Sequence, residues 1–580
     1  MTQSWGGSWS AEGWTVRLWA PEALRVDLIL DGHEHPMTAQ AGGFWSATVP
    51  ARPGMGYRFR VDGETFPDPA SRCQAGGVHD ASRVTGPDDF PWQADWGGRD
   101  WSGAVLYELH LGAFTGEGTL SAATERLAEL AELGFTAVEL MPVGQWAGAR
   151  GWGYDGVLPF ALHPAYGRPD DLRRFVDRAH GLGLMVILDL VMNHFGPEGA
   201  CLHRIAPAFF DRARHTPWGA AFDFAQAPVR EYWIECAEYW LGSFRLDGLR
   251  LDAVHQIAGP GAETFLRTLA QRARVVDPGR AIHLIVEDER NEPTLRETSY
   301  DAAWNDDFHH AIHCLLTGES HGYYASFARD PMDDLARALL RGHVEEGQPR
   351  PGQPRPGQPR PGLTRPRGHP CAHLPTTAFV NATQTHDQIG NRARGERLLT
   401  LADPQGVRTA YALLLLSPYI PMVFMGEERG AITPFLFFAD YAGELAEAVR
   451  KGRAAAFSEI AALGAEAPDP LAEGSFALSH LDWRDNDRAR DWLDLTRRAL
   501  AFRAARVVPL LASGPRLEAQ VERRGPAALR AVWRFAAGTL RLALSMGTPD
   551  PAPCPPRGAR FDLGRPGIDR FALSVGVEPG

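Results

Sequence analysis

The pattern of hydrophobic and polar positions divides the chain into three zones. Over residues 14–84 the apolar runs are short and are separated by turn residues such as Asp31-Gly32. From residue 101 onward, apolar strands alternate with amphipathic helices. After about residue 505 the runs become short and strand-like again. These changes of period predict a β module, a long α/β domain and a second β module.

The first and last zones have the pattern of antiparallel β domains. Turn signals between short strands are typical of sandwiches, so we expect an N-terminal immunoglobulin-like β-sandwich and a small C-terminal β-sandwich. The expected strands are Trp14–Trp19, Val26–Leu30, Phe44–Val49, Tyr57–Val61, Leu529–Phe535 and Thr539–Leu544. Neither zone offers a candidate nucleophile, base or metal cluster, so we expect neither to be catalytic.

The middle zone repeats the order strand, helix, strand, helix. Its expected strands are Val105–Leu111, Ala137–Val143, Met185–Val191, a strand ending at Asp252, His283–Glu287, Phe379–Gln384 and Pro421–Met425. Its expected helices include Ala122–Leu133, Asp170–Gly181, Val229–Leu241 and Ala262–Arg274. Apolar strands between helices form a parallel sheet covered on both faces, and about eight such units favour a (β/α)8 TIM barrel. The alternative, a doubly wound sheet, requires a glycine-rich phosphate turn after an early strand, which we do not find.

We therefore expect three domains in this α/β protein. They are a β-sandwich module over 1–95, a catalytic barrel over 96–505 with a short insertion at about 193–228 and a low-complexity loop at 347–366, and a β domain over 506–580. The loop contains the pentapeptide Gly-Gln-Pro-Arg-Pro three times over Gly347–Pro361. The repeat lacks large apolar residues, so we interpret it as an expansion in a tolerant surface loop, with an Arg-lined gate as the alternative.

Composition narrows the class of protein. The 580-residue chain has a formal net charge of −12 and no long basic stripe, which argues against nucleic acid as a partner. Its six cysteines are scattered without paired spacing, which indicates free thiols. We see no secretion signal over residues 1–19 and no apolar stretch near the ~20 residues of a membrane span. We expect a cytoplasmic monomer or homodimer that binds no membrane.

The strand that ends at Asp252 carries the first candidate chemistry. Arg250 and Asp252 are two residues apart, so they share a face of the strand. A neighbouring Arg lowers the pKa of an Asp, and an ionised carboxylate at the mouth of a barrel is where a nucleophile is placed. A structural Arg–Asp pair that closes the barrel is the alternative. Asp247 has the opposite parity, and we interpret it as a turn or structural carboxylate.

The next strand ends at Glu287, after four mostly apolar residues. Desolvation there raises the pKa of a carboxyl group and keeps its proton, as a general acid requires. The adjacent Asp288 and Glu289 remain alternatives. Further polar groups follow two other strands, in Asp189-Leu-Val-Met-Asn-His194 and in Thr385-His386-Asp387. One ionised and one protonated carboxyl group in a single site are the chemistry of glycoside cleavage.

Four ordered segments resemble the signature regions of the α-amylase family of glycoside hydrolases (family 13). They are Asp189–His194, Gly248-Leu-Arg-Leu-Asp252, Val286-Glu287 and His386-Asp387. The resemblance implies a (β/α)8 barrel and a retaining double displacement. It implies that Asp252 is the nucleophile, Glu287 the acid and then the base, and Asp387 the carboxylate that stabilises the transition state.

The same resemblance implies roles for residues that bind substrate. Arg250 would orient Asp252, His194 and His386 would bind hydroxyls of the sugar being cleaved, and Tyr154 would stack under that sugar. Other stretches, including Arg150–Val157, Asp306–His310 and Phe437–Lys451, resemble the subfamily that hydrolyses the α-1,4 bond next to a terminal trehalose unit. The residues implied on the leaving-group side are His255, Asp306, Asp307, Phe308, His309, His310 and Gln388.

Some features bear on what the resemblance implies. Asn193 matches a metal ligand of the family, but this subfamily does not generally need the ion, so we expect no metal and no cofactor. Thr385 stands where the family usually has Asn. The implied partners are an α-glucan ending in trehalose and water as co-substrate. A branching or debranching enzyme of the same family is the second hypothesis, and a barrel that only binds glycans is the third.

Overall fold

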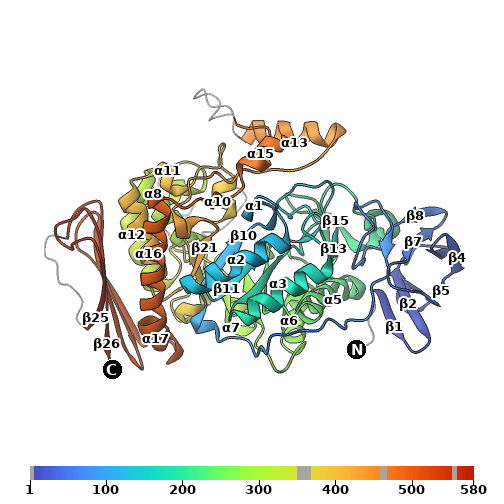
Figure 1. Ribbon diagram of the computed structural model, residues 1–580, viewed down its shortest axis with the longest axis horizontal. Coiled ribbons are helices and arrows are strands. Elements are labelled where there is room, and N and C mark those ends of the chain that lie inside the picture. Colours follow the sequence, from blue (N-terminus) through green and yellow to red (C-terminus); the bar gives the residue numbers. More distant parts are fainter. Residues whose placement is uncertain (1–4, 349–366, 457–466, 551–557) are drawn as a thin grey trace.

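The computed structural model describes residues 5–348, 367–456, 467–550 and 558–580. Figure 1 shows three bodies in a row, with the N-terminal strands at one end, a helix-covered barrel in the centre and a C-terminal sheet at the other end. Most of the predicted Gly347–Pro361 repeat lies outside the described residues. Within the described residues, none of the helices combines the length and the apolar character needed to cross a membrane.

The N-terminal domain is the predicted sandwich of two antiparallel sheets. One sheet has the order β1-β2-β6-β5, and the other has the order β4-β3-β7-β8 with β9 paired to β7. The strands are β1 Gly6–Ser10, β2 Gly13–Trp19, β3 Val26–Leu30, β4 His33–Pro36, β5 Thr38–Ala39, β6 Phe44–Val49, β7 Gly56–Val61, β8 Glu64–Phe66 and β9 Ser82–Arg83. Alternate residues of β2 are buried, as expected for a strand with one face on a core.

Trp5 joins the sandwich to the barrel. Its side chain is fully buried, and its indole Nε1 donates to the carbonyl of Pro228 at 3.0 Å. Its backbone N–H donates to Glu235 at 3.0 Å, and its ring packs edge-on against Tyr232 at 4.9 Å. These three residues belong to helix α5 (Ala227–Ser243), so the start of the chain is bound to a barrel helix.

The central sheet is a closed barrel of eight parallel strands, which confirms the predicted fold class. In order, the strands are β10 Leu106–Leu109, β11 Ala137–Leu140, β14 Met185–Leu190, β17 Gly248–Leu251, β18 His283–Val286, β19 Ala302–Trp304, β20 Phe379–Ala382 and β21 Ile420–Phe424. The sequence did not predict β19. Its three residues are too few to establish a hydrophobic pattern, and pairing with β18 and β20 defines it instead.

Helices follow most of these strands, and most of the helices lie around the barrel. They are α1 Leu111–Phe114, α2 Leu120–Leu133, α3 Pro169–Gly181, α4 Leu202–Ile205, α5, α6 Ala262–Ala273, α7 Thr294–Thr298, α8 Asp306–Thr317, α9 Pro331–Arg341, α10 His386–Gly390, α11 Leu398–Leu401, α12 Pro404–Leu416, α13 Gly443–Ala456, α15 Glu473–Leu478, α16 Asp487–Phe502 and α17 Val508–Ala512. Two hairpins extend the loops, β12 Gly144–Gln145 with β13 Leu158–Leu162, and β15 Phe210–His215 with β16 Ala220–Phe222.

Local chemistry explains where these helices begin and end, as α2 illustrates. The Thr119 hydroxyl accepts the N–H of Ala122 and caps the first turn. Gly134 ends the helix with a φ of +105°, a conformation that costs glycine little. Between the caps, Leu120, Leu127 and other apolar residues at helical spacing are buried against the barrel.

The C-terminal domain differs from the predicted sandwich. In the described residues it is a single five-stranded antiparallel sheet with the order β22-β23-β24-β26-β25. Its strands are β22 Glu518–Arg523, β23 Ala528–Phe535, β24 Gly538–Met546, β25 Ala559–Leu563 and β26 Phe571–Pro579. The sheet packs on the barrel helices α9 and α12, and Trp533 donates to the Leu339 carbonyl of α9 at 3.1 Å. Helices cover the apolar face that a second sheet would otherwise bury.

Asp247, which immediately precedes β17, is a structural carboxylate. It is fully buried and accepts hydrogen bonds from Trp96 (2.7 Å), from His180 (2.9 Å) and from the backbone N–H of Val186 (2.8 Å). Arg280 lies 3.3 Å from the same carboxylate. The group therefore ties three separate segments to the start of β17.

Replacing Asp247 with Ala should destabilise the barrel strongly, because it leaves a buried cation and several donors without their acceptor. We expect a loss of about 3–5 kcal/mol in the free energy of unfolding, measured by denaturant or thermal unfolding. The matched control is Asp485→Ala, whose side chain is 72% exposed and pairs with Arg490 at the surface. That control should change stability by less than ~1 kcal/mol. Equal losses in the two variants would contradict the structural role of Asp247.

Candidate active site

The three carboxylates singled out by the sequence follow three barrel strands. Asp252 comes directly after β17, Glu287 directly after β18, and Asp387 is the second residue of α10, which follows β20. In a parallel barrel the carboxyl ends of all strands meet at one rim, where barrel enzymes hold their active sites. The fold therefore gathers these side chains at one mouth.

One guanidinium, that of Arg250, connects the carboxylates at this mouth. Its Nη1 donates to Asp189 at 2.7 and 2.8 Å and to Asp252 at 2.9 Å, while its Nη2 donates to Glu287 at 2.8 Å. The group is buried and lies over the Trp304 ring at 4.0 Å. Side chains from β14, β17 and β19 and from the end of β18 are thus fixed around one cation, and Asp252 and Glu287 lie within mutual reach.

The pKa values of the pair are the reverse of the sequence prediction. Burial and the neighbouring Glu287 raise the pKa of Asp252 to about 8. Burial also acts to raise the pKa of Glu287, but Arg250 and the backbone N–H of Ala253, which donates at 3.0 Å, bring it below its usual value. The prediction was wrong because residue spacing did not show that Nη2 of Arg250 reaches Glu287. Without substrate, the surroundings thus raise the pKa of Asp252 and lower that of Glu287.

The two neighbours of Glu287 that remained open differ from it in environment. Asp288 is buried and accepts two hydrogen bonds from Arg290, at 2.8 and 2.7 Å. The Glu289 side chain is 53% exposed and lies 3.6 Å from His255. Neither contacts Arg250 in the described structure, so the geometry favours Glu287 as the partner of Asp252.

A hydrogen-bonded chain leads from Asp252 to His194. Asn193 Nδ2 donates to Asp252 at 2.9 Å, and its Oδ1 accepts from His194 Nδ1 at 2.6 Å. Burial lowers the pKa of His194 to about 4, so the ring is neutral and its Nε2 is left as an acceptor. Trp218, half exposed, stacks on His194 with ring centres 5.2 Å apart. Trp218 was not predicted from the sequence, because a single Trp in a loop carries no pattern.

A second cluster surrounds Asp387. His386 Nδ1 donates to the buried Glu108 at 2.5 Å. Burial lowers the pKa of His386, but Glu108 outweighs it and the pKa lies above its usual value. The ring of Tyr154 stacks on His386 at 5.1 Å, and its hydroxyl donates to Asp189 at 2.6 Å. Glu108, like Asp189, is an acidic residue inside an apolar strand, and that position is the signal by which the sequence could have identified it.

Thr385 caps the helix that carries Asp387. Its hydroxyl accepts the N–H of Asp387 at 3.2 Å and donates to Gln388 at 2.8 Å. Gln388 also accepts the backbone N–H of Thr385 at 2.8 Å, so its carbonyl oxygen is committed to the cap. The family's usual Asn is thus replaced by a residue that fixes the start of α10.

Helix α8 does not present all five of its predicted substrate residues to the cleft. Phe308 is in the hydrophobic core, and His309 is buried between the carbonyl of Thr383 (2.6 Å) and the hydroxyl of Tyr324 (3.0 Å). Asp307 is fully buried and accepts the backbone N–H groups of Val344 and Glu345, the amide of Asn291 and the guanidinium of Arg367. Each residue of a helix turns by ~100°, so five in a row cannot share one face. The side chains of Asp307, Phe308 and His309 are thus packed inside the protein rather than gathered at the carboxylates.

Asp306 and His310 remain candidates for the cleft. Burial and the nearby Glu287 raise the pKa of Asp306 to about 7, and Asp387 acts in the same direction. His310 lies 5.0 Å from the ring of Tyr323, which is 40% exposed. Asp306 is therefore close enough to both carboxylates to sense their charge. In the described residues, no three His, Cys, Asp or Glu side chains are grouped to hold a metal ion.

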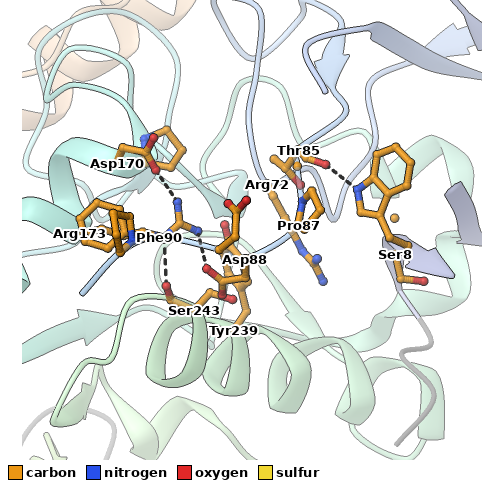
Figure 2. Close-up of a pocket in the computed structure, with 16 residues that line it drawn as sticks. Ser8, Arg72, Thr85, Pro87, Asp88, Phe90, Asp170, Arg173, Tyr239 and Ser243 are labelled. Atoms are coloured by element: carbon orange, nitrogen blue, oxygen red, sulfur yellow. Dashed lines mark hydrogen bonds and ion pairs between the residues drawn. The ribbon is translucent and has the colours of Figure 1, made fainter. Parts of the chain in front are cut away.

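A separate hollow of about 470 Å³ lies where the N-terminal sandwich meets the barrel (Figure 2). There Arg173 bridges Asp170 and Asp88 at 2.8 and 3.3 Å, and Arg72 lies over the Tyr239 ring at 4.9 Å. None of the predicted site residues lines this hollow. The hollow is therefore separate from the carboxylates at the barrel mouth.

Comparisons with known proteins agree with this geometry. Residues 85–207 match the model of the alpha amylase catalytic domain, and residues 4–75 match that of carbohydrate-binding module 48, the isoamylase N-terminal domain. The malto-oligosyltrehalose trehalohydrolase of Deinococcus radiodurans is 42% identical over 82% of this chain and 78% of its own length. That of Arthrobacter ramosus is 39% identical over 93% and 94%. A crystal structure from Salmonella typhimurium, described as an alpha amylase, is 43% identical with a TM-score of 0.94 and full coverage of both chains.

The raised pKa of Asp252 predicts a pH-dependent effect of Asp252→Asn on stability. The folded chain holds the Asp252 proton up to about pH 8, whereas the unfolded chain loses it near pH 4. The stability contributed by this group is therefore complete below about pH 4 and is lost as the pH rises to about 8. Because Asn cannot ionise, the Tm of the variant relative to the wild type should rise across this window and level off above it. Thermal unfolding from pH 4 to 9 measures this, and a constant difference in Tm would contradict the assignment.

Proposed function

The chain belongs to the malto-oligosyltrehalose trehalohydrolases of the α-amylase family of glycoside hydrolases, and we propose that Asp252, Glu287 and Asp387 are its catalytic residues. It releases trehalose by hydrolysis of a malto-oligosyltrehalose. The bond cleaved is the α-1,4-glucosidic bond next to the terminal trehalose. The observation that carries the proposal is that one guanidinium binds Asp252 and Glu287 together.

The reaction proceeds in two displacements with retention of configuration. Asp252 attacks the anomeric carbon while Glu287 protonates the glycosidic oxygen, and trehalose leaves. Glu287 then takes a proton from water, which attacks the glycosyl ester and frees Asp252. A retaining mechanism needs the two carboxyl groups about 5–5.5 Å apart, and a shared guanidinium supports this closeness. Asp387 stabilises the oxocarbenium-like transition state.

Substrate binding moves the proton of the pair. In the unliganded site the proton favours Asp252, whereas the first displacement needs it on Glu287. The glycosidic oxygen gives a protonated Glu287 an acceptor, and the positive charge that develops on the sugar favours an ionised Asp252. Both effects act in the direction that the reaction requires. We infer that the proton passes from Asp252 to Glu287 as the sugar binds.

The remaining polar residues divide between the two sides of the scissile bond. Tyr154 stacks under the sugar that is cleaved, and His194 and His386 bind its hydroxyls. On the trehalose side we retain four of the predicted residues, namely His255, Asp306, His310 and Gln388. Asp307, Phe308 and His309 anchor the buried side of α8 and do not contact substrate.

The setting of the enzyme is also part of the proposal. The described cysteines carry free thiols, and three of them, Cys236, Cys314 and Cys371, are buried. Free thiols are usual in a reducing compartment, so we place the protein in the cytoplasm. The substrate reaches the rim of the barrel directly from solvent, where Asp387 is exposed.

A product assay tests the function. Incubation with maltotriosyltrehalose should release free trehalose, and maltopentaose should be cleaved far more slowly. Trehalose is quantified by chromatography of the products. The opposite preference, or altered iodine staining of long glucans with no trehalose released, would replace this proposal with the branching or debranching alternative.

Glu287→Gln should remove most of the turnover, because amide nitrogen cannot deliver the proton to the leaving oxygen. We expect kcat to fall by about 10²–10⁴-fold with the circular dichroism spectrum unchanged. Glu297→Gln is the matched control, because its side chain is 40% exposed and pairs with His373 away from the carboxylates. Near-normal turnover of Glu287→Gln, or an equal loss in the control, would refute the assignment of the acid.

A further inference from the structure

We propose that Arg453 is a positioning residue that orients the Asp387 carboxylate through Asn391. This inference rests on the proposed catalytic role of Asp387. Arg453 lies on α13, which is outside the barrel sheet and follows β21 in the chain. Figure 1 shows α13 projecting beyond the end of the barrel where α10 lies. A segment remote in sequence thus reaches back to the catalytic rim.

Arg453 grips the turn that ends α10. Its Nη1 donates to Asn391 Oδ1 at 3.2 Å, and its Nη2 donates to the carbonyl of Gly390 at 3.0 Å. The guanidinium also lies over the ring of Phe437 at 4.5 Å, which fixes its plane. Two donors on one rigid group therefore bind two consecutive residues of the turn.

Asn391 passes this constraint to Asp387. Its Nδ2 donates to Asp387 Oδ1 at 2.7 Å, and its backbone N–H donates to the Asp387 carbonyl at 3.0 Å. The amide is thus clamped between a cation on one side and a carboxylate on the other. Asp387 keeps its second oxygen for a sugar hydroxyl while the first is held.

The two partners of Asn391 determine the orientation of its side-chain amide. The oxygen of Asn391 must face Arg453, which has only donors, and its NH₂ group must face Asp387, which accepts. A flipped amide would place oxygen against carboxylate and NH₂ against guanidinium. Without Arg453 the turn still exists, but a flipped Asn391 amide no longer loses its hydrogen bond to a guanidinium. Arg453 therefore selects the rotamer of Asn391 that binds Asp387.

Arg453 stays charged under working conditions. Burial lowers its pKa to about 10, which still leaves the guanidinium protonated at neutral pH. The charge of Asp387 acts in the opposite direction and favours the cation. The donor that fixes Asn391 is therefore present whenever the enzyme turns over.

The test is a double-mutant cycle on trehalose release with kcat and KM measured separately. Arg453→Met and Asn391→Ala should each lower kcat by about 10- to 100-fold, the scale of one hydrogen bond to a charged group, with KM within about threefold. The double variant should lose no more than the worse single variant, because both act on one contact. Arg453→Lys should recover part of kcat, since a Lys restores one donor.

Arg450→Met is the matched control on the same helix. Arg450 pairs with Glu447 and Asp469 and does not contact the α10 turn in the described structure, so its replacement should leave kcat unchanged. If the losses of kcat multiply in the double variant, or if only KM or Tm changes, the positioning role of Arg453 is overturned. Asp387→Asn separates the two proposals. If Asp387→Asn leaves turnover intact, the proposed catalytic role of Asp387 fails. If Asp387→Asn is inactive but the losses of Arg453→Met and Asn391→Ala multiply, only the positioning role of Arg453 is refuted.

Discussion

A buried cation bound by three acidic side chains holds the mouth of this barrel together. Arg250 connects Asp189, Asp252 and Glu287, and its guanidinium lies over the ring of Trp304. These groups come from four neighbouring strands or their ends, β14, β17, β18 and β19, so the local geometry depends on the closed sheet that sets their spacing. An isolated buried charge of either sign is costly, and the cluster persists because every member compensates another.

That arrangement also decides how the protons are distributed. Arg250 and the backbone N–H of Ala253 together lower the pKa of Glu287, whereas burial and the nearby Glu287 raise the pKa of Asp252 despite its contact with Arg250. A reacting sugar must then reverse the preference. The resting site is therefore not a copy of the reactive one, and part of the catalytic arrangement is created by the ligand.

The sequence predicted the architecture well where a pattern extends over several residues. Seven barrel strands follow apolar runs, and Asp252 and Glu287 were identified because they end two of them. The three-residue strand Ala302–Trp304 carries too little pattern, and tertiary pairing defines it. The direction of the two pKa shifts was wrong because it depends on where a long side chain reaches. The inward rotation of Asp307 and His309 depends on the facing loops, which linear spacing does not reveal.

The buried side chain of Trp5 has a consequence for exchanging N-terminal domains between related enzymes. Trp5 belongs to the sandwich in sequence, yet its nitrogen atoms bond only to residues of α5 in the described structure. The relative orientation of module and barrel is therefore encoded on both sides of the joint. In a chimaera that joins the sandwich of one relative to the barrel of another, the native orientation of the two domains should persist only under one condition. The residue at position 5 and its partners on α5 must come from the same parent.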